Sequence, residues 1–120
     1  MIALYATLFG LALGSFANVA IDRVPRRLPL GGRSRCDGCR RALGALEMIP
    51  ALSYIWLRGR CATCDAPIGL RSPIVEALCG AAFGVAFALF APAAALIACS
   101  AGLSLVVMTG VALKRAEVNA

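Results

Sequence analysis

The sequence predicts an all-α membrane protein with three transmembrane helices and a cytoplasmic loop that carries a zinc-ribbon-like four-cysteine site. Hydrophobic residues make up 61% of the 120 residues, whereas charged residues make up 15%. Residues 2–21 and 77–113 contain no charge, and ten of the twelve basic residues lie between Arg23 and Arg71. The same basic segment contains two CxxC pairs. Two long uncharged blocks around a basic segment are typical of an integral membrane protein.

The uncharged blocks define the expected spans. Residues 1–21 are predicted to form the first transmembrane helix, because about 20 apolar residues cross a bilayer. The second block is too long for one span and sufficient for two, so we predict a helical hairpin over residues 74–113 with its turn at Pro92. A cleaved signal peptide is the alternative for the first block. The positive charge that normally precedes a signal's apolar stretch follows it here.

The basic residues predict the orientation. The loop over residues 22–73 carries ten arginines, and Lys114 and Arg115 begin a tail over residues 114–120. Three spans put the loop and the tail on one side, and the positive-inside rule makes that side cytoplasmic. The N-terminus and the Pro92 turn are then expected outside. Arginines near span ends also contact anionic lipid headgroups. Without aromatic residues interleaved among them, they do not indicate a nucleic-acid partner.

The two cysteine pairs are the most specific signal in the loop. They are separated by 21 residues and consist of Cys36, Cys39, Cys61 and Cys64. Each pair supplies two thiolates from one turn, and the intervening segment lets the second turn fold back onto the first. Two CxxC pairs at this separation predict a tetrahedral metal site with four sulfur ligands.

Zn²⁺ is the first choice of metal, because it accepts four thiolates in a closed structural site. A rubredoxin-like iron site has the same ligands. Disulfides are the other alternative, which a reducing cytoplasmic location disfavours. Four thiolates around a dication leave a charge of about −2, which Arg35, Arg40 and Arg60 would offset. Cys79 and Cys99 lie within spans and are expected to be small packing residues.

Residues 43–58 are apolar but contain Glu47 and Pro50. We predict that this segment lies at the membrane surface, where Tyr54 and Trp56 suit the headgroup level. A further transmembrane helix is the alternative, and it would place the two cysteine pairs on opposite sides of the membrane.

The spans carry small and polar residues at helical spacing. Gly10 with Gly14, and Gly80 with Gly84, form small-xxx-small steps that let another helix approach closely. We expect these faces to contact other membrane proteins, while the other faces contact the lipid bilayer. Asn18 lies about one turn inside the end of the first span and is expected to form an interhelical hydrogen bond.

Many residues in this order match one family. They are Gly14-Ser15-Phe16, Asn18-Val19, Ile21, Arg23, Pro25, Arg33-Ser34, Cys36, Cys39, Ile49-Pro50, Ser53-Tyr54, Leu57-Arg58-Gly59-Arg60-Cys61, Cys64, Pro67-Ile68, Arg71, Pro73 and Glu76. Over about residues 10–78 the chain resembles the N-terminal part of the bacterial prepilin peptidases, which are type IV leader peptidases and N-methyltransferases. Asp37 stands where the family often has proline, and Ser72 where it often has an aromatic residue.

The resemblance implies a bacterial inner-membrane location but not peptidase activity. The family uses two membrane aspartates, an acid and a base, to activate water. Here Asp22, Asp37 and Asp65 lie in or beside the loop, and Ala112 occupies the place where the first catalytic aspartate would be sought. Glu76 is expected to complement a helix dipole or to pair with a loop arginine. The sequence therefore indicates no catalytic residue, and nothing in it indicates a pocket for a methyl donor.

Two classes of function remain at this point. The first is a non-enzymatic, zinc-stabilised binding or packing subunit of a larger membrane complex. The second is enzymatic, either a truncated or partial prepilin peptidase or a leader-peptide N-methyltransferase half. The length of the natural gene product is expected to distinguish them best, because descent from an enzyme family does not establish activity.

Overall fold

The computed structural model describes residues 1–33, 35, 36, 38–44, 50–67 and 70–120, and within them it contains four α-helices. The helices are α1 (Ile2–Arg23), α2 (Pro50–Trp56), α3 (Arg71–Leu89) and α4 (Pro92–Asn119). Helices α1, α3 and α4 are long and apolar enough to cross a membrane. The described part contains no strand beyond two isolated β-bridges. The predicted all-helical fold class with three candidate spans is confirmed.

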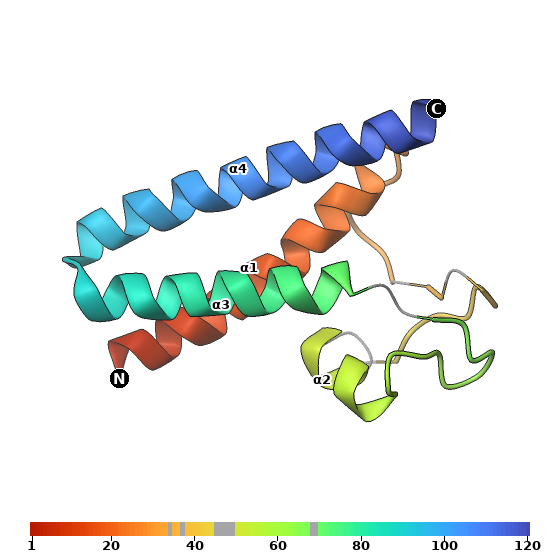
Figure 1. Cartoon of the computed structure of the whole chain (residues 1–120), viewed down its shortest axis with the longest axis horizontal. Coiled ribbons are helices and arrows are strands. Elements are labelled where there is room, and N and C mark those ends of the chain that lie inside the picture. The colour runs from red at the N-terminus through yellow and green to blue at the C-terminus, as the bar shows by residue number, and fades with distance from the viewer. Residues whose placement is uncertain (34, 37, 45–49, 68–69) are drawn as a thin grey trace.

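The loop, α2 and the C-terminus lie at the same end of the long helices (Figure 1). The N-terminus and the turn between α3 and α4 lie at the opposite end. We call residues 31–67, as far as the structure describes them, the cysteine lobe. The lobe extends beyond the ends of α1 and α3, so its polar residues are kept apart from the apolar helix faces.

Glycines allow α1 to approach α3 at backbone distance. A Cβ atom added at Gly10 would lie 2.6 Å from the carbonyl oxygen of Cys79. A Cβ atom at Gly14 would lie 2.8 Å from the Cα atom of Glu76. Real Cβ atoms do not approach other atoms this closely, so α1 can pack here only with glycine at both positions.

The glycines of α3 face the same interface from the other side. A Cβ atom at Gly80 would lie 2.6 Å from Leu11 Cδ2, and one at Gly84 would collide with the hydroxyl of Thr7. We expected Gly10, Gly14, Gly80 and Gly84 to contact other membrane proteins. In the structure they instead join α1 to α3 within one chain. The expectation was incomplete because spacing identifies a close-packing face but not its partner.

Replacing Gly14 by alanine is expected to destabilise the protein by about 1–3 kcal/mol, because the new methyl group must push α1 and α3 apart. Gly102 in α4 provides the matched control, since no atom lies within 4 Å of a Cβ added there. Gly102→Ala should therefore leave stability unchanged or raise it through better helix propensity. Thermal unfolding in detergent measures both variants. Equal stability of the two would contradict the close α1–α3 contact.

An apolar cluster closes the bundle between α1, α3 and α4. Ala6, Phe83 and Cys99 are buried together, and Leu13, Ala86 and Phe87 pack around them. The ring of Phe83 also meets that of Phe9 edge-on, with centroids 6.0 Å apart. Cys99 belongs to this cluster, and Cys79 is buried between α1 and α3. Both cysteines therefore act as small packing residues, as expected.

The helix bounds differ from the sequence prediction at the loop end. Helix α3 begins at Arg71, and α4 continues through most of residues 114–120. Pro92 lies in the first turn of α4, where its missing N–H group leaves no helical bond unmade. The predicted turn at Pro92 is thus present. The charged tail is a continuation of the last helix.

Within residues 43–58 the structure places a single helix of 7 residues, α2, and residues 45–49 lie outside the described part. A helix of this length extends roughly 10 Å, about a third of a hydrocarbon core. The described helix of this segment is thus too short to cross a bilayer by itself.

Candidate functional site

The first cysteine pair lies on a tight turn closed by backbone hydrogen bonds. Arg35 and Ala42 form an antiparallel bridge across the turn. The Cys36 amide donates to the Arg41 carbonyl at 2.9 Å, and the Arg40 amide donates to the Cys36 carbonyl at 2.9 Å. Arg40 has φ +56°, a left-handed conformation that reverses the chain after the second cysteine. This turn holds the side chains of both cysteines on one side.

The second pair repeats this geometry 25 residues later. Arg60 and Pro67 form the bridge, the Cys61 amide donates to the Ala66 carbonyl at 2.9 Å, and Asp65 has φ +60°. The Asp65 amide also donates to the Cys61 carbonyl at 3.1 Å. Two equivalent turns, each presenting two sulfurs, are the arrangement that a four-cysteine metal site requires.

The four sulfurs meet at one point, as the spacing predicted. The Sγ atoms of Cys36, Cys39, Cys61 and Cys64 all lie within 4.8 Å of one another. The distance from Cys36 Sγ to Cys64 Sγ is 3.5 Å, and all four thiols are free. Sulfurs bound tetrahedrally to one metal at 2.3 Å would be about 3.8 Å apart, whereas a disulfide requires about 2.05 Å. The cluster therefore suits a metal ion. It also places the two pairs on the same side of the membrane.

The thiols differ in acidity within this cluster. Backbone hydrogen bonds from Cys64 and Thr63 lower the pKa of the Cys61 thiol to about 6. The backbone hydrogen bond of Ala66 favours the Cys64 thiolate, but desolvation and the three neighbouring sulfurs raise its pKa to about 11. The neighbouring sulfurs thus oppose ionisation of the Cys64 thiol. A dication at the centre would remove that opposition and stabilise all four thiolates.

A glycine makes the close approach of the two turns possible. A Cβ atom added at Gly38 would lie 2.9 Å from Ala66 Cβ and 3.0 Å from Cys64 Sγ. The second turn is placed by α2, which ends at Trp56 and is followed by Gly59 with φ +72°. The Gly59 amide donates to the Tyr54 carbonyl at 2.9 Å, and the Tyr54 ring covers the glycine. Any side chain at Gly59 would displace that ring, so this short helix fixes where Cys61 begins.

Polar contacts join the cysteine lobe to the helix ends. The guanidinium of Arg23 donates to a row of backbone carbonyls at 2.6–3.4 Å, those of Pro29, Leu30, Gly31 and Gly32. Arg71 Nη2 lies 2.6 Å from Asp22 Oδ1, and both side chains are about half exposed. An ion pair this exposed contributes about 0–1 kcal/mol. The carbonyl row around Arg23 is therefore the more specific restraint on the chain as it leaves α1.

Asn18 forms the interhelical hydrogen bond that the sequence predicted. Its Nδ2 atom donates to the Ser72 carbonyl at 2.9 Å and to the Gly14 carbonyl at 3.2 Å. Asn18 is buried, and its Oδ1 atom has no hydrogen-bond partner in the described part of the chain. Glu76 is 3% exposed, so it lies inside the helix pair rather than on an outer first turn. Sequence reasoning placed Glu76 near a span end but did not predict its burial.

The carboxylates are dispersed. Asp22 and Asp65 lie at the loop end, as expected, while Asp37 lies outside the described residues. Ala112 lies on α4 among exposed positions. The described ion pairs each join a carboxylate to a basic side chain, and the described cluster of potential metal ligands consists of cysteines.

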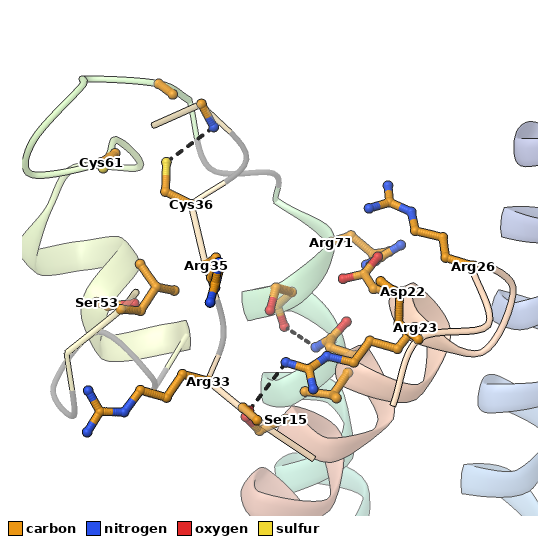
Figure 2. A pocket seen from close by; sticks show the side chains of 18 of the residues that line it. Ser15, Asp22, Arg23, Arg26, Arg33, Arg35, Cys36, Ser53, Cys61 and Arg71 are labelled. Carbon is orange, nitrogen blue, oxygen red and sulfur yellow. Dashed lines mark hydrogen bonds and ion pairs between the residues drawn. The ribbon is translucent and has the colours of Figure 1, made fainter. Parts of the chain in front are cut away.

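A cavity of about 890 Å³ separates the cysteine lobe from the helix ends, and the sequence analysis did not predict it. Its walls include Ser15 and Asn18 of α1 and Cys36 and Cys61 of the cysteine cluster. Six basic side chains also line it: Arg23, Arg26, Arg33, Arg35, Arg71 and Lys114. The arginines come from the α1 end, the lobe and the start of α3 (Figure 2). The dense arginine content of the loop was the available signal, but only the folded chain gathers these residues around one space.

Known proteins are similar in sequence to most of this chain. The family profile described as "Bacterial Peptidase A24 N-terminal domain" matches residues 8–90. A prepilin leader peptidase/N-methyltransferase from Burkholderia pseudomallei (strain 1026b) is 38% identical over 78% of this chain and 39% of its own length. A protein of the same description from Myxococcus xanthus (strain DK1622) is 44% identical over 69% of this chain and 25% of its own length.

A third relative with this description, from Bacillus subtilis (strain 168), is 38% identical over 69% of this chain and 37% of its own length. The chain thus spans between 25% and 39% of the length of these three relatives. No solved structure matches the chain. The profile covers most of the chain, including all four clustered cysteines and the α1–α3 pair. The chain therefore belongs to the bacterial peptidase A24 N-terminal domain family.

Proposed function

We propose that this chain is a prepilin-peptidase-like protein of the bacterial inner membrane that has no peptidase activity by itself. In this proposal it acts as a binding or packing subunit of a larger membrane complex, and zinc stabilises its cysteine lobe. The observation that carries the proposal is the all-sulfur cluster, whose four Sγ atoms lie within 4.8 Å of one another beside three apolar helices. Four sulfur ligands leave a metal no open position for water or substrate, so the expected role is structural.

The acidic residues support the lack of peptidase activity in this chain alone. Acid–base activation of water needs two carboxylates within reach of the same molecule. Of the six acidic residues, Glu76 is the one found buried in the described part, and it lies between helices. Asp22 is held by Arg71 at the lobe end of α1. Asp65 and Glu117 are exposed and pair with Arg60 and Lys114.

Charge and exposed apolar residues support an orientation for the chain. The basic loop and Lys114 lie at the same end of the helices, so the positive-inside rule places that end in the cytoplasm. The N-terminus and the α3–α4 turn are then outside. Helix α2 exposes Leu52, Ile55 and Trp56, which suits the membrane surface at the cytoplasmic side.

Helix α4 is the best candidate for contacts with partner membrane proteins. Of the most apolar 18 residues of α4, 6% are buried, whereas 28% of the corresponding residues of α1 are buried. The small-residue faces of α1 and α3 are already occupied by each other. On α4, Gly102 has no neighbour within 4 Å of an added Cβ, and Leu105 and Met108 are largely exposed. This face can pack against lipid or against a partner helix, and we assign the partner contact to it.

Cleavage of a prepilin by the purified chain tests the proposal directly. The 120-residue chain in detergent should leave a prepilin substrate intact, while a full-length relative under the same conditions cleaves it. The assay measures loss of the leader peptide from the prepilin. The metal content of the purified chain verifies that a chain without this activity is folded. Cleavage by the metal-loaded chain alone would overturn the proposal.

A second candidate function follows from the coverage of the relatives. The chain aligns with 25–39% of proteins described as leader peptidase/N-methyltransferases, so it can equally represent the N-terminal part of such an enzyme. Incubation with labelled S-adenosylmethionine and a processed pilin separates the candidates. Label on the pilin N-terminus supports the enzymatic alternative, and its absence supports the binding subunit.

A further inference from the structure

The cavity between the cysteine lobe and the helix ends carries a strong surplus of positive charge. Among the residues that the structure describes, six basic side chains and one carboxylate, Asp22, line it. A dication held by four thiolates at the cavity edge would add a charge of about −2. The walls would then still carry a net charge of about +3. The cations therefore exceed what the metal cluster and Asp22 can neutralise.

Half of these cations already have partners within the chain. Arg23 donates to the carbonyls that follow α1, Arg71 pairs with Asp22, and Lys114 lies 3.0 Å from Glu117. The side chains of Arg26, Arg33 and Arg35 make no hydrogen bond or ion pair with any other described residue. Three arginines that line one cavity and have no side-chain partner among the described residues provide an unmet anion-binding capacity.

The position of the cavity along the candidate membrane-spanning helices indicates which kind of anion it binds. Its walls begin at Ser15 and Val19, inside the candidate span α1, and continue past the end of that helix into the cysteine lobe. Lys114 contributes from the end of α4. The space thus lies where the apolar part of the helices gives way to charged residues, which is the level of lipid headgroups. Basic pockets between transmembrane helices at this level bind anionic headgroups.

We propose that this cavity binds the phosphodiester headgroup of an anionic phospholipid, with Arg26, Arg33 and Arg35 neutralising the phosphate. A volume of about 890 Å³ accommodates a phosphoglycerol headgroup together with bridging water. Bound there, the lipid connects the lobe arginines Arg33 and Arg35 to the α1 end. It would thereby hold the cysteine lobe against the membrane. The proposal is independent of whether the chain has enzymatic activity.

Native mass spectrometry of the detergent-solubilised full chain tests this site. Phosphatidylglycerol and the zwitterionic lipid phosphatidylcholine are titrated separately into the wild type and into Arg26→Gln/Arg33→Gln. The wild type should retain phosphatidylglycerol in preference to phosphatidylcholine. The double variant should bind phosphatidylglycerol on the order of thirtyfold more weakly, because each of the two arginines near the surface contributes about 1 kcal/mol to the interaction. Neither substitution touches a cysteine turn, and unchanged metal content verifies that the lobe is folded.

Arg27→Gln/Arg58→Gln is the matched control, since it removes the same charge at positions that do not line the cavity. It should keep wild-type affinity for phosphatidylglycerol. Equal weakening in both double variants, or equal retention of the two lipids by the wild type, would overturn the proposal. In a third titration, the soluble phosphate ester glycerol 3-phosphate is added to the wild type at the same concentrations as phosphatidylglycerol. If it binds as tightly as phosphatidylglycerol, the cavity takes a soluble phosphate ester and the lipid assignment is wrong.

Discussion

The double substitution Cys36→Ser/Cys61→Ser is expected to abolish metal binding and unfold the cysteine lobe. One sulfur is lost from each turn, so neither pair can complete a tetrahedral set. The described lobe residues bury few side chains beyond Ser53 and Cys61, and a segment this small cannot build its own hydrophobic core. Structural zinc sites contribute about 10–16 kcal/mol in small domains. Loss of the metal should therefore remove most of the lobe's stability.

Elemental analysis and limited trypsin digestion measure the two parts of this prediction. We expect about one zinc per wild-type chain, and rapid cleavage in the variant at lobe arginines such as Arg40 and Arg60. Helical circular dichroism should change little, because α1, α3 and α4 do not depend on the lobe for their packing. Cys99→Ser is the matched control, since Cys99 lies in the apolar cluster and outside the metal site. It should retain full metal content.

A metal-free wild-type protein that stays resistant to trypsin would refute the structural role of the metal.

Acidification of the wild-type protein tests metal binding in graded steps. Metal binding displaces the proton of Cys64, whose pKa is raised to about 11, and keeps Cys61 ionised. The metal-free form therefore carries more protons, and lowering the pH favours it. Metal affinity should fall steadily as the pH decreases.

Asn18→Asp is expected to cost at least about 3 kcal/mol, although the substitution barely changes the side-chain shape. The Asn18 amide donates to the carbonyls of Gly14 and Ser72, which lie on α1 and α3. An ionised aspartate would turn two donor–acceptor contacts into contacts between oxygens, inside a buried site. Thermal unfolding in detergent should show a large drop in the midpoint temperature, because the variant no longer holds α1 against α3.

Asn18→Leu distinguishes the polarity of the site from its shape. It removes both donors, but it also removes the Oδ1 acceptor that has no partner among described residues. The two carbonyls keep their helical hydrogen bonds, so the expected loss is about 1 kcal/mol. If the leucine and aspartate variants lose the same stability, the hydrogen bonds of Asn18 do not hold α3 to α1.

Several features of the fold followed from local patterns. The uncharged blocks correctly predicted three long apolar helices, because a membrane span requires a continuous apolar stretch and leaves a strong signal. Pro92 marked the turn because proline favours the first turn of a helix. The CxxC spacing identified the cysteine cluster that could hold a metal ion, because each turn fixes its own two sulfurs locally. None of these inferences needed knowledge of which distant segments meet.

Other features depended on distant contacts and were missed or only partly seen. The glycine steps revealed close packing, but their partner turned out to be the other helix of the same chain. Glu76 was expected in a helix first turn, whereas the approach of α1 buries it. The arginine-lined cavity arises from α1, the lobe, α3 and α4 together, so no stretch of sequence contains its signal.

The amino-acid order alone determined the number of spans, the position of the cysteine turns and the family resemblance, because each is encoded within a window of a few to about twenty residues. Tertiary structure decided that the glycine faces are internal, that Asn18 connects α1 to α3, and that unpartnered arginines share one cavity. These depend on how α1 crosses α3 and where the lobe then folds. That geometry is set by the summed packing of residues far apart in the chain.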